Sequence, residues 1–221
     1  MSPRSLFLPI TAVSRGDFAE RLVQLVIGLV LYGVALALMV RGGIGVAPWD
    51  VLSLGLSGRT GIPYGLTTSL IAVAVLLLWI PLRQRVGLGT VLNALLIGPS
   101  ADTALRFIPV PETIWMGAAL FVTGLVLLAF ASGLYISAAF GPGPRDGLMT
   151  GLVARTGRPI WMVRTVIEGG VLFIGFLLGG PVGIGTVLFA FGVGPLVGWF
   201  LPALQRLRRV RESRRMPLPV A

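Results

Sequence analysis

The sequence predicts an all-α, polytopic membrane protein, and three observations carry this prediction. Of the 221 residues, 55% are hydrophobic and only 12% are charged, whereas about a quarter of a soluble domain is charged. Uncharged runs of 19 and 23 residues follow Arg21 and Arg59, and a spanning helix needs about 20 residues. The chain also aligns with itself at a shift of 96 positions. We therefore expect about six transmembrane helices and two short re-entrant half-helices, built from two homologous, inverted repeats.

The self-alignment pairs residues 45–99 with residues 141–195 without a gap. Of these 55 positions 23 are identical, where a composition rich in Leu, Gly and Val gives roughly a tenth by chance, so the pairing indicates a duplication. The expected divisions are a cytoplasmic lead-in at 1–20, membrane repeat 1 at 21–109, membrane repeat 2 at 115–202 and an Arg-rich cytoplasmic tail at 203–221.

Uncharged length and flanking charge indicate three stretches of spanning length in each half. The expected spans are residues 22–40, 62–81, 86–106, 115–137, 159–178 and 183–202. A shorter apolar piece, at 48–58 and again at 144–154, separates the first span from the second in each half. At about 11 residues and about 1.5 Å per residue it reaches only about halfway through the hydrocarbon core, so we expect both pieces to be re-entrant.

The arginines predict the orientation in the membrane. With the N-terminus inside, most arginines fall on the cytoplasmic side if each half crosses three times, as the positive-inside rule requires. Both termini then lie in the cytoplasm, and the second half is inverted relative to the first. If the short pieces span fully, each half crosses four times and the repeat is parallel. We prefer the inverted arrangement in a bacterial inner membrane.

The composition excludes several kinds of chemistry. The chain has no Cys and no His, and all 18 basic residues are Arg, which removes thiolate nucleophiles, imidazole bases and Schiff-base lysines. We expect no catalytic residues, no metal, no cofactor and no enzyme activity. Six arginines lie between Arg206 and Arg215, directly after the last apolar stretch. This cluster indicates contact with anionic lipid rather than with nucleic acid.

A Gly-x-x-Pro-x-Asp motif opens both short pieces. Its residues are Gly45, Pro48 and Asp50 in the first half and Gly141, Pro144 and Asp146 in the second. Proline suits the first turn of a helix, and an Asp two residues later faces free N–H groups, so helix capping is one interpretation. The other is direct contact of Asp50 and Asp146 with a substrate or a cation at a half-helix inside the membrane.

Trp49 in the first motif is replaced by Arg145 in the second. An aromatic ring and a cation at equivalent places suit recognition of an apolar or aromatic anion. The alternative, which we favour slightly, is that Trp49 anchors the chain at the membrane interface and Arg145 follows the positive-inside rule.

Further polar candidates lie within the expected spans. Arg164 and Glu168 are four residues apart on one helix face, so they form either a purely structural ion pair or a site for substrate or proton coupling. Asn93 is a weaker polar candidate. For Tyr32 and Tyr135 we favour a core or interface position over a pore.

A second motif, Gly-x-Gly-Thr-Val-Leu followed by Gly-Pro, occupies the third span of each half. Small residues allow close backbone approach, so four of its glycines are expected to pack helices. These are Gly87, Gly89, Gly183 and Gly185. The Gly-Pro pairs are expected to interrupt their spans and provide a kink or a gate. They are Gly98 with Pro99 and Gly194 with Pro195.

The chain resembles the YczE/YyaS/YitT group of bacterial integral membrane proteins, and the YczE-like branch in particular. The resemblance is carried by the stretch GIGVAPWDVL at residues 43–52, the TGIPYG that follows it and the later GLGTVLN. The resemblance covers most of residues 20–202. It implies a multi-pass inner-membrane protein and supplies no catalytic residues. Regulators of an aminotransferase-like type encoded beside some relatives imply an amine, amino-acid or vitamin-like solute.

These observations favour a small-solute permease with a central site between the two repeats. Asp50, Asp146 and Glu168 would handle a cation or proton, while Arg145 and Arg164 would meet an anionic group. The alternative is a non-transporting scaffold or regulatory protein that binds a cytoplasmic partner through its basic tail. The lipid bilayer and a second copy of the chain are the other partners considered.

Overall fold

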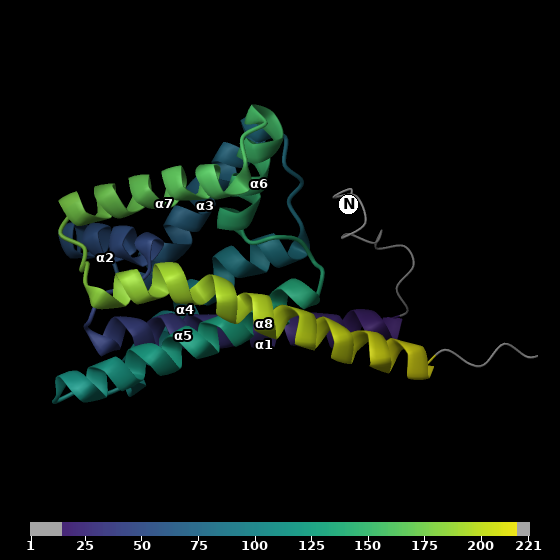
Figure 1. Cartoon of the computed structure of the whole chain (residues 1–221), viewed down its shortest axis with the longest axis horizontal. Coiled ribbons are helices and arrows are strands. Elements are labelled where there is room, and N and C mark those ends of the chain that lie inside the picture. The colour runs from purple at the N-terminus through teal and green to yellow at the C-terminus, as the bar shows by residue number, and fades with distance from the viewer. Residues whose placement is uncertain (1–14, 216–221) are drawn as a thin grey trace, which may run out of the picture.

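The computed structural model describes residues 15–215, and all regular structure in this range is helical (Figure 1). The helices are α1 (Arg15–Gly42), α2 (Pro48–Thr60), α3 (Tyr64–Leu82), α4 (Leu88–Phe107), α5 (Ile114–Ser137), α6 (Pro144–Thr156), α7 (Ile160–Leu177) and α8 (Ile184–Arg215). The all-α prediction is confirmed. The first 14 residues of the expected lead-in and residues 216–221 of the expected tail lie outside the described residues.

A helix occupies each of the six ranges expected to span. Five of these helices, namely α1, α3, α5, α7 and α8, are long and apolar enough to cross a membrane. The sixth, α4, has 20 residues but is less apolar, because it carries Asn93, Asp102 and Arg106. A crossing by α4 therefore stays a prediction.

The two short helices begin at the prolines of the Gly-x-x-Pro-x-Asp motifs. Both α2 and α6 have 13 residues, which is about 20 Å at about 1.5 Å per residue and less than the hydrocarbon core of about 30 Å. Each ends at a glycine in the left-handed region, Gly61 at φ 72° and Gly157 at φ 66°, a conformation that glycine adopts at little cost. Neither helix is long enough to cross the bilayer alone.

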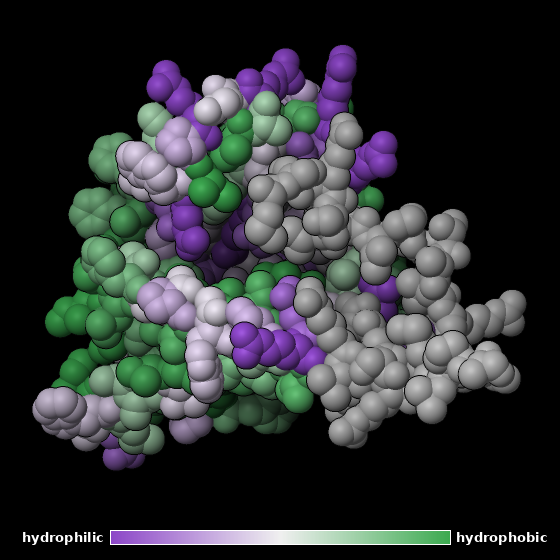
Figure 2. All heavy atoms as spheres, turned by 45° about the vertical axis from the view of Figure 1, so that its right-hand side comes forward, coloured by the Kyte–Doolittle hydropathy of each residue, from purple (hydrophilic) through white to green (hydrophobic). Residues whose placement is uncertain are grey.

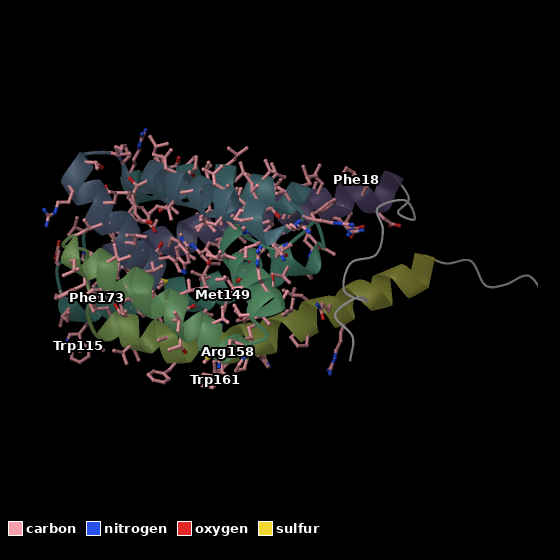
Figure 3. All side chains as sticks on the ribbon, turned by 90° about the horizontal axis from the view of Figure 1, so that it is seen from above. Phe18, Trp115, Met149, Arg158, Trp161 and Phe173 are labelled. Atoms are coloured by element: carbon pink, nitrogen blue, oxygen red, sulfur yellow. The ribbon has the colours of Figure 1, made fainter. Side chains whose placement is uncertain are left out.

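The outer surface of the helices is largely apolar. The side chains of Trp115, Trp161 and Phe173 are exposed by 82%, 68% and 63%, and all three point away from the bundle in Figure 3. Large apolar side chains exposed on several helices at once are costly in water and suited to lipid. Trp also favours the boundary between lipid and water.

At the centre, α1 and α5 pack closely along their lengths in opposite directions. A Cβ added at Gly42, near the end of α1, would lie 2.7 Å from the carbonyl oxygen of Gly117, near the start of α5. At the other end, a Cβ at Gly28 would lie 2.9 Å from the nitrogen of Tyr135. Glycine at these crossings permits the close approach on which packing within a bilayer depends. Helix α4 packs against α1, and α8 packs against α5.

The short helix of each half packs against the second span of the other half. Helix α2 contacts α7, and α6 contacts α3. The arginine near the end of each short helix binds the last carbonyls of its partner: Arg59 donates to Leu178 at 3.2 Å, and Arg155 donates to Pro81. A cation at this position interacts favourably with the negative end of the helix dipole. The starts of α2, α3 and α4 precede those of α6, α7 and α8 by 96 residues each.

The loops before the short helices are held in the same reciprocal way. The N–H of Gly89 donates to the carbonyl of Phe140 at 2.9 Å, and the N–H of Gly185 donates to the carbonyl of Ile44 at 2.8 Å. A Cβ at Gly87 would lie 2.3 Å from Phe140 O, and a Cβ at Gly183 would lie 2.4 Å from Ile44 O. The four motif glycines thus permit close approach, but mainly to loop backbone rather than to a neighbouring helix.

The helices do not end at the Gly-Pro pairs, since α4 continues through Pro99 and α8 through Pro195, and a kink or a gate at these pairs stays a prediction. Proline is tolerated inside membrane helices because neighbouring groups satisfy the freed backbone atoms. The two glycines differ in their surroundings. A Cβ at Gly98 would lie 2.1 Å from the carbonyl oxygen of Gly65 on α3, whereas Gly194 has open space around it. Gly98 therefore lies where α4 crosses α3.

Gly98→Ala is expected to lower the unfolding free energy by about 1–3 kcal/mol, because the added methyl group forces α3 and α4 apart. The matched control is Gly194→Ala, the same change at the equivalent position of the other half, which should cost little or stabilise. Thermal unfolding of both purified variants in one detergent checks this. Equal melting temperatures for the two variants would contradict the crossing.

Candidate functional site

A cavity of about 270 Å³ lies between the two halves, and all eight described helices contribute to its lining. Figure 2 shows a recess with hydrophilic residues at its base, between two parts of the molecule whose visible surface carries many apolar residues. Polar side chains that converge on one cavity inside an apolar protein are the usual mark of a solute site.

Six of the seven candidate binding residues line this cavity, although up to 119 positions separate them in the chain. They are Trp49, Asn93, Arg145, Asp146, Arg164 and Glu168. The seventh, Asp50, lies behind the lining and is only 1% exposed. Gly98 and Gly194 also line the cavity.

The carboxylate of Asp50 is held by two groups from other helices. It accepts a hydrogen bond of 3.0 Å from the hydroxyl of Tyr64, and the guanidinium of Arg145 lies 3.9 Å away. The latter distance is that of an ion pair too long for a direct hydrogen bond. The side-chain hydrogen bond of Asp50 thus goes to α3, which differs from the capping interpretation.

Asp146, the equivalent residue of the second half, is open to the cavity. Its carboxylate accepts a hydrogen bond of 2.9 Å from the hydroxyl of Tyr135. Over the described range, no basic side chain lies within 4.0 Å of it. The two aspartates are therefore equivalent in sequence but not in environment.

Trp49 and Arg145 meet at the cavity. The guanidinium carbon of Arg145 lies 5.0 Å from the centroid of the Trp49 ring, within the range of a cation–π interaction. Trp49 is only 6% exposed, which does not suit an anchor at the lipid–water boundary. Arg145 is likewise not a simple loop cation, because it reaches the buried Asp50.

Arg164 and Glu168 form the i,i+4 ion pair that their spacing allows, with 3.0 Å between Nε and Oε1. The side chains are 46% and 21% exposed, so the pair lies on an open part of the wall. Asn93 is half-buried on the α4 side. Within the described part of the chain, no three His, Cys, Asp or Glu side chains gather as a metal site would require.

Sequence reasoning missed two polar residues. Tyr64 supplies the hydroxyl that holds Asp50. Asp102, on α4, accepts hydrogen bonds from the backbone N–H groups of Gly65 at 2.7 Å and Leu66 at 3.2 Å, and so caps the start of α3. A carboxylate within an expected span was the available signal for Asp102. Tyr135, expected in the core or at an interface, lines the cavity.

An apolar outer surface around a polar internal cavity defines the molecule as an integral membrane protein. A family model described as a family of unknown function (DUF6198) matches residues 19–202, and the chain belongs to this family.

The relatives agree with this assignment. The chain is 39% identical over 186 residues to an uncharacterised protein of Haemophilus influenzae, covering 84% of this chain and 85% of the relative. It is 32% identical to the uncharacterised membrane protein YczE of Bacillus subtilis, with coverage of 85% and 88%. It is 30% identical to YyaS of the same organism, with coverage of 81% and 92%. The resemblance to the YczE-type group is confirmed, and no solved structure matches the chain.

Tyr64→Phe is expected to lower the unfolding free energy by about 2 kcal/mol, because the buried Asp50 loses the hydroxyl donor that Tyr64 provides while the ring is retained. Tyr135→Phe is the matched control and should cost less, because water in the cavity can replace the hydroxyl at Asp146. Chemical denaturation in one bicelle preparation compares them. A cost for Tyr135→Phe as large as that for Tyr64→Phe would show that the two aspartates share one environment.

Proposed function

We propose that the protein is a small-solute permease of the bacterial inner membrane, with the central cavity as its solute site. The observation that carries this proposal is the convergence of charged and aromatic side chains from both halves on one cavity within an apolar shell. Ionisable groups inside a membrane are expensive, so several of them at one cavity favour a function over a structural role.

The proposal takes the two halves to be inverted repeats that open the cavity alternately to the two sides of the membrane. Three features support it: the 96-residue offset of equivalent helix starts, the opposite directions of α1 and α5, and the reciprocal contacts of the two short helices. Inverted repeats that place a site near the bilayer midplane are the common architecture for alternating access. In Figure 1, α7 runs from α6 toward the opposite end of the molecule, and α8 returns from there.

The arginines that end the short helices suit the role of gates. Arg59 binds the end of α7, and Arg155 binds the end of α3. With the halves inverted, these contacts lie toward opposite faces of the membrane. Breaking one while the other holds would open the cavity to one side at a time.

The cavity residues divide the work of recognition. The carboxylates of Asp50, Asp146 and Glu168 are the candidates for a cation or a proton, and the guanidinium groups of Arg145 and Arg164 are the candidates for an anionic group. The sequence contains no nucleotide-binding motif, so coupling is to an ion gradient or to a separate subunit. Both termini lie in the cytoplasm, and the protein catalyses no reaction.

The rival function, a scaffold that binds a partner through its basic tail, has one observation in its favour. Helix α8 has 32 residues and continues to Arg215. Its length of about 48 Å, at about 1.5 Å per residue, exceeds a hydrocarbon core of about 30 Å. The arginine-rich end therefore projects beyond the bilayer, where it can meet a partner or anionic lipid.

Two-sided access to the cavity separates the two functions. Because the chain has no cysteine, Ala72→Cys introduces a single thiol on α3 at the cavity lining. A membrane-impermeant methanethiosulfonate reagent should label this thiol both in intact cells and in inside-out vesicles if the cavity opens alternately. Ala101→Cys, at a fully buried position outside the lining, should remain unlabelled in both preparations.

Labelling of Ala72→Cys from one side only would contradict alternating access. The scaffold would then be the better account, and deletion of residues 206–221 should abolish the activity of the protein in cells.

A further inference from the structure

The charges around the cavity do not balance. Two guanidinium groups, those of Arg145 and Arg164, face three carboxylates, those of Asp50, Asp146 and Glu168. Arg145 is paired with Asp50, and Arg164 is paired with Glu168. If all five groups are ionised, one negative charge remains, and by position it belongs to Asp146.

The surroundings of Asp146 leave room for a ligand. Tyr135 occupies part of its hydrogen-bonding capacity, but an ionised carboxylate offers about four lone-pair sites. Arg145 and Arg164 act on it electrostatically from beyond ion-pair distance. Its side chain is exposed to the cavity, whereas that of Asp50 is enclosed. Asp146 is thus the carboxylate that a solute can reach.

Aromatic rings complete this part of the wall. Tyr32 and Tyr135 both line the cavity and meet edge to face, with 6.1 Å between their ring centroids. Trp49 belongs to the same lining, where Arg145 lies over its ring. Aromatic rings next to a carboxylate are a good environment for an ammonium group, since the ring faces attract cations. A cavity of about 270 Å³ is of the size that suits a small organic solute.

From these observations we infer that the cavity binds a small organic cation, a protonated amine with an apolar or aromatic body, with its ammonium group on Asp146. The inference rests on the proposed function and narrows its solute. It reverses the anionic solute that Trp49 and Arg145 suggest from sequence, because Asp50 already neutralises Arg145.

Three phenyl compounds of similar size test the charge preference directly: phenethylamine as the cation, 2-phenylethanol as the neutral analogue and phenylacetate as the anion. The readout is the melting temperature of the full-length purified protein, followed by its tryptophan fluorescence. Phenethylamine should raise the melting temperature more than the other two. Asp146→Asn should weaken the apparent affinity for phenethylamine by about tenfold or more, because a charge-assisted contact is lost.

Asp102→Asn is the matched control, since Asp102 is a carboxylate of the same bundle that caps α3 and does not line the cavity. It should retain the response to phenethylamine even where it lowers the melting temperature. If Asp146→Asn does not fold, Asp146→Glu, which keeps the charge, is compared in its place and should retain the preference for the cation.

Equal or greater stabilisation by phenylacetate would overturn the inference and assign the site to an anion at Arg145. An unchanged response of Asp146→Asn, or no response to any of the three compounds, would also overturn it. The labelling of Ala72→Cys requires no solute, so the two proposals can fail separately. A wrong charge preference leaves the permease proposal standing. One-sided labelling contradicts the permease proposal, whichever compound binds in the cavity.

Discussion

The structure depends on a reciprocal backbone contact between its two halves. In each half, a backbone carbonyl of the loop before the short helix accepts a hydrogen bond from the start of the last helix of the other half. The carbonyl of Ile44 accepts from the N–H of Gly185, and the carbonyl of Phe140 accepts from the N–H of Gly89. Backbone groups inside a membrane must be satisfied by the protein itself. Glycines permit the contact, because any side chain at Gly87 or Gly183 would collide with these carbonyls. The two loops, and the short helices that follow them, are thereby fixed against the opposite half.

The cavity lies between the halves that this exchange joins, and its two sides carry different side chains. Helices α2 and α6 begin at equivalent prolines, yet one presents an aromatic ring and the other a cation, and these two side chains meet each other. Arg145 neutralises the enclosed Asp50, so of the two aspartates Asp146 is the one open to the cavity. Equivalent helices thus present different side chains to the cavity, as the proposed recognition of an asymmetric solute requires. The Arg164–Glu168 pair, which has no charged equivalent in the first half, adds to this difference.

Much of the architecture could be predicted from the sequence. Uncharged length and flanking charge predicted the positions of the six long helices, and proline predicted the starts of α2 and α6, because these are local constraints. The tertiary partners could not be predicted in this way. The glycine spacing predicted a close approach, but it did not show that the neighbouring backbone is a loop. The i,i+4 spacing predicted the Arg164–Glu168 ion pair on α7, but it could not reveal Tyr64 or Asp102, whose hydrogen bonds join different helices. The environments of Asp50 and Asp146 also required the fold, since their local sequences are alike.

The central claim is that the two halves have opposite orientations in the membrane, and single cysteines at Gly58 and Ala154 test it most directly. These positions are equivalent in the self-alignment and both are exposed, near the ends of α2 and α6. With a membrane-impermeant thiol reagent on intact cells, the account predicts labelling at position 58 and none at 154, and the reverse in inside-out vesicles. Labelling of both positions, or of neither, in intact cells would contradict it and indicate a parallel repeat.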